Sequence, residues 1–169
     1  MRKYKVLFAD LDDTLITRWS GKTFAQGIWD MKFKFEVWRK IKELEPEYIF
    51  IITNQGGLGK FVNENDFIKK LDYVEVSLKD YVKHDKFKGI QSMYCDSVDK
   101  GDPFRKPNPG MVKYFLNELS DKGYTKDDCL MIGDASGKEG NFSDSDIKTA
   151  ENAGIAYLDV DDFLSVTFF

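Results

Sequence analysis

Short apolar runs alternate along the chain with longer stretches in which apolar residues recur at helical spacing. The runs are each short enough to be buried strands, and they lie at 6–9, 48–52, 90–94, 129–132 and 155–158. Helices are predicted between them over 33–44, 63–82, 108–123 and 146–152, the third with Asn108 as N-cap and Pro109 as its first residue. Strands that alternate with helices predict an α/β fold of three layers, a parallel sheet with helices on both faces.

Residues 16–32 interrupt this alternation. Glycines and aromatic residues follow one another there in an order too irregular for a helix, so we expect a short flap. The length of 169 residues, without repeat or linker, suggests a single domain over 1–169.

Composition and charge narrow the class of protein. A net charge of -4 argues against a general duplex-binding protein with a strongly basic face, although a local basic patch is compatible with it. Cys95 and Cys129 are far apart and have no neighbouring His, which indicates reduced core thiols and argues against a structural zinc site. The first strand follows the start directly, and no apolar run has membrane-spanning length, so we expect a cytoplasmic protein.

Acidic residues follow the first strand immediately. Because side chains alternate along a strand, Asp10 and Asp12 tend to point to the same side, at the edge where open α/β sheets bind ligands. Two like charges held this close repel, and a cation or a shared proton usually relieves them. Taken alone, the segment is equally typical of a solvated acidic turn.

Further polar clusters follow other predicted strands, and they favour a functional site. Thr53 and Asn54 follow the second strand, and Asp134 follows the fourth. The carboxyl ends of parallel strands meet at one edge, so these side chains should converge. Arg105 and Lys106 add positive charge in a loop that the following proline keeps extended.

The order and spacing of these clusters resemble a known four-motif signature. Asp10-x-Asp12-x-Thr14, Thr53, Lys106, and Gly133-Asp134 with a later acid are similar to the motifs of haloacid dehalogenase-like phosphatases. The likeness extends to the phosphatase domain of the polynucleotide kinase 3′-phosphatases, through Asp10 to Thr17, Ser20-Gly21-Lys22-x-Phe24, Thr53-Asn54-Gln55-x-Gly57-x-Gly59, Arg105-Lys106-Pro107, Gly133-Asp134-Ala135-Ser136-Gly137 and Asn141-Phe142-Ser143-Asp144-Ser145-Asp146. Two departures are Asp13, where those enzymes commonly carry Gly, and a shortened stretch between Gly137 and Phe142.

The resemblance implies a Rossmann-like sheet of the haloacid dehalogenase type, a small flap without a large cap domain, and a phosphomonoesterase mechanism. Asp10 would attack phosphorus to form an aspartyl-phosphate, and Asp12 would act first as general acid and then as base. Thr53 and Lys106 complete the implied catalytic residues, and the implied substrate-binding residues are Thr14, Asn54 and Arg105. Mg²⁺ would be held by Asp10, the backbone carbonyl of Asp12, Asp134 and Asp146, with Asp144 as the alternative to Asp146.

The implied reaction removes 3′-phosphate from polynucleotide ends, as in DNA repair, with a separate kinase or ligase as a partner. A site without a cap should be open and admit the end of a polymer. Trp19, Trp29 and Phe24 would then stack on bases, or form a small core of the flap, which is the better interpretation for Phe24. Neighbouring phosphates would meet the basic residues of these loops, Arg18, Lys22, Lys60 and Arg105.

Two alternatives come from different classes. The first is a small-molecule phosphatase of the same superfamily, acting on a sugar phosphate or a compound like histidinol phosphate, although the Cys/His zinc loop common in such enzymes is absent between Tyr94 and Arg105. The second is a non-catalytic binding module, which would be expected to lose Asp10 or Asp12. Gly59-Lys60 and Gly137-Lys138 do not complete a P-loop, so no kinase site is predicted, and His84 is expected on the surface of a helix.

Overall fold

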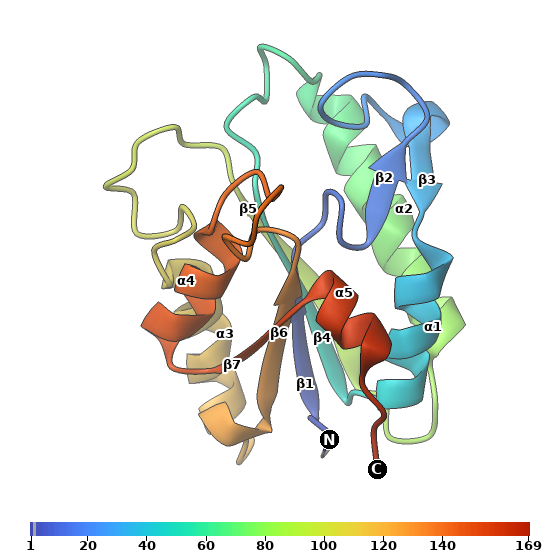
Figure 1. Ribbon diagram of the computed structural model, residues 1–169, viewed down its shortest axis with the longest axis vertical. Coiled ribbons are helices and arrows are strands. Elements are labelled where there is room, and N and C mark those ends of the chain that lie inside the picture. Colours follow the sequence, from blue (N-terminus) through green and yellow to red (C-terminus); the bar gives the residue numbers. More distant parts are fainter. Residues whose placement is uncertain (2) are drawn as a thin grey trace.

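The computed structural model describes residue 1 and residues 3–169. At its centre lies a parallel sheet with the strand order β5-β4-β1-β6-β7 (Figure 1). The strands are β1 (Val6–Ala9), β4 (Tyr48–Asn54), β5 (Gly89–Cys95), β6 (Cys129–Gly133) and β7 (Ala156–Asp159). The predicted parallel sheet is confirmed, and β1 lies in its middle because it pairs with β4 and with β6.

Helices cover both faces of this sheet (Figure 1). One face carries α1 (Phe35–Leu44), α2 (Glu64–Val82) and α5 (Val160–Ser165), and the other carries α3 (Gly110–Ser120) and α4 (Ser145–Ala153). Leu7 and Ala9 of β1 pack into the first core, whereas Val6 and Phe8 pack into the second. Because both faces of this strand are buried, all of its side chains are apolar, which explains the uninterrupted apolar run.

Several boundaries differ from the predictions. Asn108 is not the N-cap of α3, which is Pro109. The Asn108 side chain instead donates to the carbonyls of Lys100 and Asp102, at 2.9 and 2.8 Å, and closes the loop before the helix. His84 lies beyond the end of α2, half-buried with Nε2 3.0 Å from the carbonyl of Pro46, so its predicted place on a helix was wrong.

The predicted flap is a hairpin. It pairs β2 (Ile16–Arg18) with β3 (Met31–Phe33) in antiparallel fashion, and the 3₁₀ turn η1 (Ile28–Asp30) precedes β3. The buried carboxylate of Asp30 accepts hydrogen bonds from Ser20 N, Ser20 Oγ and Gln26 N, at 2.7, 2.8 and 3.0 Å. The hairpin stands beside α2, above the carboxyl edge of the sheet (Figure 1). A second 3₁₀ turn, η2 (Lys126–Asp128), leads into β6.

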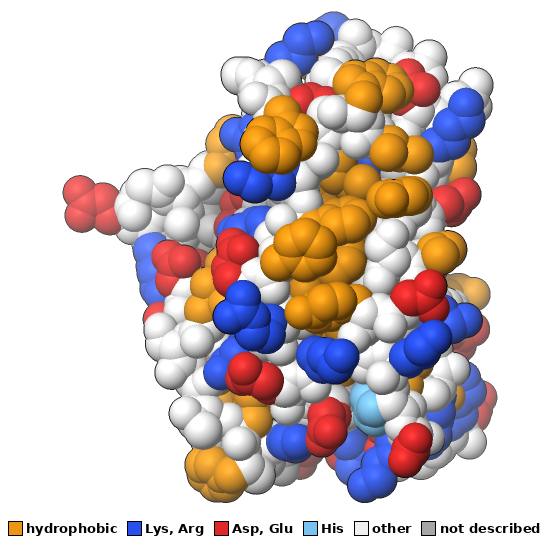
Figure 2. All heavy atoms as spheres, turned by 90° about the vertical axis from the view of Figure 1, so that its right-hand side faces the viewer, with side chains coloured by type: hydrophobic (Ala, Val, Ile, Leu, Met, Phe, Trp, Pro, Cys, Tyr) orange, Lys and Arg blue, Asp and Glu red, His pale blue; other side chains and the backbone are white. Residues whose placement is uncertain are grey.

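Hydrophobic side chains gather in a stripe on the side of the molecule that carries the hairpin and α1 (Figure 2). Aromatic rings of β3, α1 and α2 contact one another on this side of the fold, namely Phe33, Phe35, Trp38, Tyr73 and Tyr81. Cys95 and Cys129 are free and buried, as predicted. Within the described part of the chain, none of the helices combines the length and apolar character needed to cross a membrane.

Candidate active site

Carboxylates from distant parts of the chain meet at the carboxyl edge of the sheet. Asp10 follows β1, Asp134 follows the adjacent β6, and Asp146 lies in the first turn of α4. One oxygen of each lies within 4.8 Å of the others. The approach of α4 depends on Gly133, because a Cβ at that position would lie 2.3 Å from Oδ2 of Asp146.

Asp144 lies outside this cluster. It is the N-cap of α4, its side chain is 47% exposed, and it pairs with Lys148 at 2.5 Å. Of the two acids that the sequence left open, the geometry therefore brings Asp146 to Asp10 and Asp134.

Lys106 lies within the carboxylate cluster. Its Nζ is 2.6 Å from Oδ1 of Asp10 and 2.6 Å from Oδ1 of Asp146, and the residue is buried. Burial alone would lower the pKa of this lysine, but the attraction of Asp10 and Asp146 outweighs it and raises that pKa. A lysine so placed stays charged and balances part of the negative charge.

One lysine does not neutralise the cluster. Burial raises the pKa of Asp10 well above its ordinary value, and repulsion by Asp146 and Asp134 adds to this effect, which Lys106 only partly opposes. Burial, with repulsion from Asp146 and Asp13, likewise raises the pKa of Asp134 to about 6. Carboxyl groups that hold their protons this firmly indicate a site suited to a further cation.

The Asn54 side chain holds the backbone of Lys106. Its Nδ2 donates to the carbonyl of Lys106 at 2.9 Å, and its Oδ1 accepts from the amide of Lys106 at 2.9 Å. Both ends of the amide group are therefore engaged, which does not fit the predicted contact with phosphate. Asn54 fixes the position of a lysine far away in the sequence.

Gln55 connects two of the predicted catalytic residues. Its Nε2 donates to Thr53 Oγ1 at 2.9 Å and to Asp12 Oδ2 at 3.0 Å, and the residue is buried. Because the Thr53 oxygen accepts this bond, its own hydrogen is left to donate elsewhere. No role is predicted for Gln55 from the sequence, although it follows Thr53 and Asn54 in the same motif.

Lys70 is a second buried lysine, which the sequence analysis missed. It comes from α2 and is 0% exposed. Its Nζ donates to the carbonyl of Ala25 at 3.0 Å and lies 3.9 Å from Asp12 Oδ1. The signal was its spacing, three residues after Phe67 and four before Val74, which places a lysine on the apolar face of the helix.

The remaining predicted residues lie at the margin of the site. Thr14 is 0% exposed and its hydroxyl donates to Asp134 Oδ1 at 3.5 Å, so in this structure it has no surface for a substrate to touch. Arg105 is half-buried, and its Nη1 donates to the carbonyl of Ser97 at 2.7 Å. Asp13, in a left-handed conformation with φ 58°, accepts from Arg18 Nη1 through both oxygens, at 2.5 and 2.6 Å.

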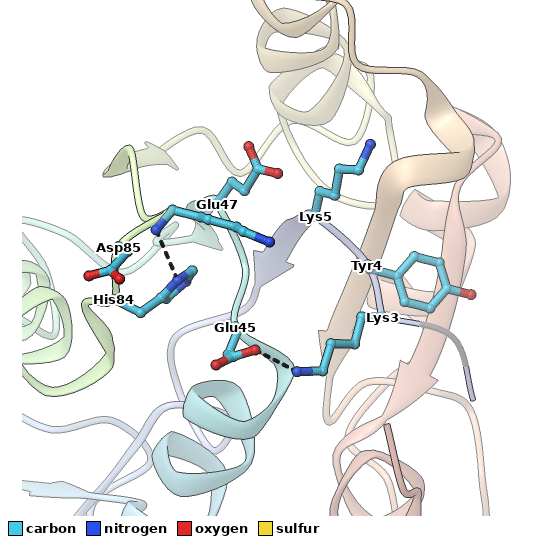
Figure 3. Close-up of a pocket in the computed structure, with 8 residues that line it drawn as sticks. Lys3, Tyr4, Lys5, Glu45, Glu47, His84 and Asp85 are labelled. Carbon is cyan, nitrogen blue, oxygen red and sulfur yellow. Dashed lines mark hydrogen bonds and ion pairs between the residues drawn. The ribbon is translucent and has the colours of Figure 1, made fainter. Parts of the chain in front are cut away.

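A hollow of about 510 Å³ lies at the opposite, amino edge of the sheet (Figure 3). Its lining carries three lysines and three acids, and four of these side chains form ion pairs with one another or with near neighbours. Lys3 lies 2.6 Å from Glu45, Lys5 lies 3.2 Å from Asp128, and Glu47 lies 2.6 Å from Lys88. Because these charges are balanced and lie far from the carboxylate cluster, we place the candidate active site at the carboxyl edge.

Solved structures share this fold. A protein assigned as a HAD-like phosphatase from Mesorhizobium loti superposes with a TM-score of 0.66 and 18% identity over 98% of this chain and 86% of that chain. The D,D-heptose 1,7-bisphosphate phosphatase of B. bronchiseptica, complexed with magnesium and phosphate, gives a TM-score of 0.68 and 18% identity over 90% of this chain and 78% of that chain. The chain thus has the haloacid dehalogenase-like fold, with a carboxylate cluster at the carboxyl edge of its sheet.

Sequence comparison narrows this class. Residues 5–164 match the family model described as polynucleotide kinase 3 phosphatase, and the chain belongs to this phosphatase family. It is 33% identical over 184 residues to a protein of Acanthamoeba polyphaga mimivirus assigned as a bifunctional polynucleotide phosphatase/kinase, covering 94% of this chain and 41% of that protein. It is 30% identical over 165 residues to the bifunctional polynucleotide phosphatase/kinase of Schizosaccharomyces pombe, covering 93% and 37%. The chain therefore spans about two fifths of the length of these relatives.

Proposed function

We propose that this chain is a Mg²⁺-dependent phosphomonoesterase that removes 3′-phosphate from polynucleotide ends through an aspartyl-phosphate on Asp10. The observation that carries the proposal is the buried carboxylate of Asp10 in contact with Lys106 and clustered with Asp134 and Asp146. Membership of the polynucleotide kinase 3 phosphatase family supports the substrate class.

The donor set fits magnesium. Mg²⁺ prefers oxygen ligands and is commonly bound by a few carboxylates together with substrate phosphate. Asp10, Asp134 and Asp146 would hold it, with the backbone carbonyl of Asp12. Bound there, the ion would supply positive charge against the phosphate dianion and the charge that builds up on it.

The chain's own residues account for the group transfer. An oxygen of Asp10 forms a bond to phosphorus while the bond from phosphorus to the sugar oxygen breaks, and the Asp12 carboxyl gives its proton to that leaving oxygen. Asp12 then takes a proton from water, whose oxygen attacks phosphorus and breaks its bond to Asp10. Proton transfer of this kind contributes roughly 10²- to 10⁴-fold. The hydrogen of the Thr53 hydroxyl and the ammonium group of Lys106 would stabilise the phosphoryl oxygens.

Two predicted substrate ligands take other parts in this proposal. Asn54 positions Lys106 through its two backbone bonds. Thr14 donates a hydrogen bond to the carboxylate of Asp134 and so helps to orient it. Arg105 keeps its predicted role next to the substrate, because its anchor to Ser97 leaves other guanidinium donors for phosphate.

The hairpin supports a polymeric substrate. Trp19 and Trp29 are each 69% exposed, and neither belongs to the main core. Exposed aromatic rings of this kind can stack on bases. Phe24 instead packs against the main core rather than forming a separate small core of the flap. Lys22 and Lys60 are exposed on neighbouring loops, whereas Arg18 is engaged by Asp13 and is a weaker candidate for phosphate contact.

The test is steady-state kinetics on matched substrates. We expect Mg²⁺-dependent release of phosphate from a 3′-phosphorylated oligonucleotide, at a much higher kcat/KM than from the 5′-phosphorylated oligonucleotide or from a panel of sugar phosphates. A higher kcat/KM on a sugar phosphate would contradict the proposal and favour a small-molecule phosphatase. A cytoplasmic location, a part in DNA repair, and a separate kinase or ligase partner stay predictions.

A further inference from the structure

A fully buried lysine needs an explanation. Lys70 interrupts the apolar face of α2, where Phe67, Leu71 and Val74 are buried, and it is itself 0% exposed. Burying an ammonium group costs free energy unless it is paired, and an apolar side chain on this face would avoid that cost. The contacts of Lys70 Nζ therefore show what the charge is used for.

The ammonium group of Lys70 holds one side of the Asp12 carboxyl group. Oδ1 of Asp12 lies 3.9 Å from Lys70 Nζ, while Oδ2 accepts the hydrogen bond of Gln55 at 3.0 Å. The side chain of Asp12 is 14% exposed. A hydrogen bond from the segment after β4 and the nearby charge of a lysine on α2 thus act on the two oxygens of the group that would transfer the proton.

The same nitrogen also holds the flap. Lys70 Nζ donates to the carbonyl of Ala25 at 3.0 Å, and Ala25 is a buried residue of the segment between β2 and β3. Asp30, which organises that loop, is close enough to influence the lysine electrostatically. One cation therefore joins the seating of the flap to the placement of Asp12.

We propose that Lys70 is a positioning residue that holds Asp12 where its proton reaches the leaving oxygen. This inference rests on the proposed function. The step concerned is cleavage of the bond between phosphorus and the leaving oxygen. The electron pair of that bond stays on the oxygen, which takes the proton of Asp12. A sugar alkoxide needs this proton, whereas p-nitrophenolate leaves without it.

Lys70→Met tests the inference, because methionine keeps an unbranched side chain as far as the ε position and lacks the ammonium group. The matched control is Lys69→Met, which changes an exposed lysine on the same helix. Lys70→Met should lower single-turnover cleavage of a 3′-phosphorylated oligonucleotide by about 10- to 100-fold, within the range of proton transfer. The pre-steady-state burst of p-nitrophenolate from p-nitrophenyl phosphate should change by less than about threefold, and Lys69→Met should change neither rate.

An equal loss on both substrates would mean that Lys70 only maintains the fold, and no loss on either would mean that it has no part in the reaction; each result overturns the inference. If Lys70→Met does not fold, Lys70→Gln, which keeps a donor for Ala25, serves in the same comparison. In an Asp12→Asn background the proton donor is gone, so Lys70→Met should cause no further loss, and a full further loss overturns the inference as well. A wild-type protein that cleaves neither substrate would instead refute the proposed function.

Discussion

At the scale of single residues, the site depends on residues that fix the position of other residues. Asn54 binds both backbone groups of Lys106, and Lys106 in turn contacts Asp10 and Asp146. A lysine held in this way presents its charge in one place, which is what stabilisation of a transferring phosphoryl group requires.

Asn54→Ala should therefore reduce activity without removing any group that touches the substrate. We expect kcat/KM to fall by about tenfold or more, and the free energy of unfolding to fall by about 1–3 kcal/mol, because the Lys106 backbone loses both partners. Asn152→Ala is the matched control, since Asn152 donates to the carbonyl of the next residue, Pro107, at 3.0 Å. Equal effects of the two substitutions in kinetics and urea unfolding would contradict the assigned role of Asn54.

Charge repulsion at Asp134 predicts how stability depends on pH. The pKa of Asp134 is raised in the folded protein from 3.8 to about 6. Ionisation of this carboxyl group therefore lowers the free energy of unfolding, with its full effect above about pH 6. The effect disappears at a pH where Asp134 is protonated in both the folded and the unfolded protein. In metal-free solution, Asp134→Asn should raise the melting temperature at about pH 7.5, by the equivalent of about 1–2 kcal/mol, because partial exposure reduces the full effect.

The gain from Asp134→Asn should shrink as the pH falls through about 6 and vanish near pH 4. With Mg²⁺ at about pH 7.5, the wild-type protein should have the higher melting temperature, since it binds the ion more tightly than Asp134→Asn does. Thermal unfolding in chelator and in excess Mg²⁺ measures both differences, with Asp144→Asn as a control outside the cluster. A variant that is less stable than wild type in chelator at about pH 7.5 would refute the argument.

At the scale of elements, the five strands of the sheet followed from short apolar runs and the larger helices from apolar periodicity, whereas the two strands of the hairpin were not predicted. Clusters at strand ends identified Asp10, Thr53 and Asp134, because parallel strands bring their carboxyl ends to one edge. The sequence favoured Asp146 over Asp144 without deciding between them, since the decision depends on which residue at the start of α4 approaches Gly133. The roles of Lys70 and Gln55 were not predicted, because their contacts with Asp12 join segments that only the folded chain brings together.

We expect the hairpin to decide which substrates reach the site. Since Trp19 and Trp29 are exposed there, a 3′-phosphorylated oligonucleotide should be preferred to a free 3′-nucleotide, and its KM should rise with salt as phosphate contacts are screened. Trp19→Ala should raise KM for the oligonucleotide by about tenfold, the equivalent of one stacked base, and leave the mononucleotide unaffected. Equal kcat/KM on both substrates with no salt dependence would favour the small-molecule alternative.

At the scale of the whole molecule, the fold gathers negative charge that one lysine does not balance. Asp10, Asp134 and Asp146 converge from three segments, and Lys106 pairs with two of them, Asp10 and Asp146. We expect chelation of Mg²⁺ to stop the reaction, and Ca²⁺ not to restore it, because a larger ion with looser geometry misplaces the carboxylate nucleophile. Phosphate release measured in excess chelator checks this, and undiminished activity there would contradict the metal's role.

The central claim is that Asp10 carries the phosphoryl group, and a single-turnover reaction with an oligonucleotide labelled in its 3′-phosphate tests it most directly. After acid quenching, the label should appear transiently on the peptide that contains Asp10, in the presence of Mg²⁺, and should be absent from a folded but inactive Asp10→Asn protein. Release of phosphate with no label on the protein at any time, or turnover by Asp10→Asn at the wild-type rate, would contradict the account.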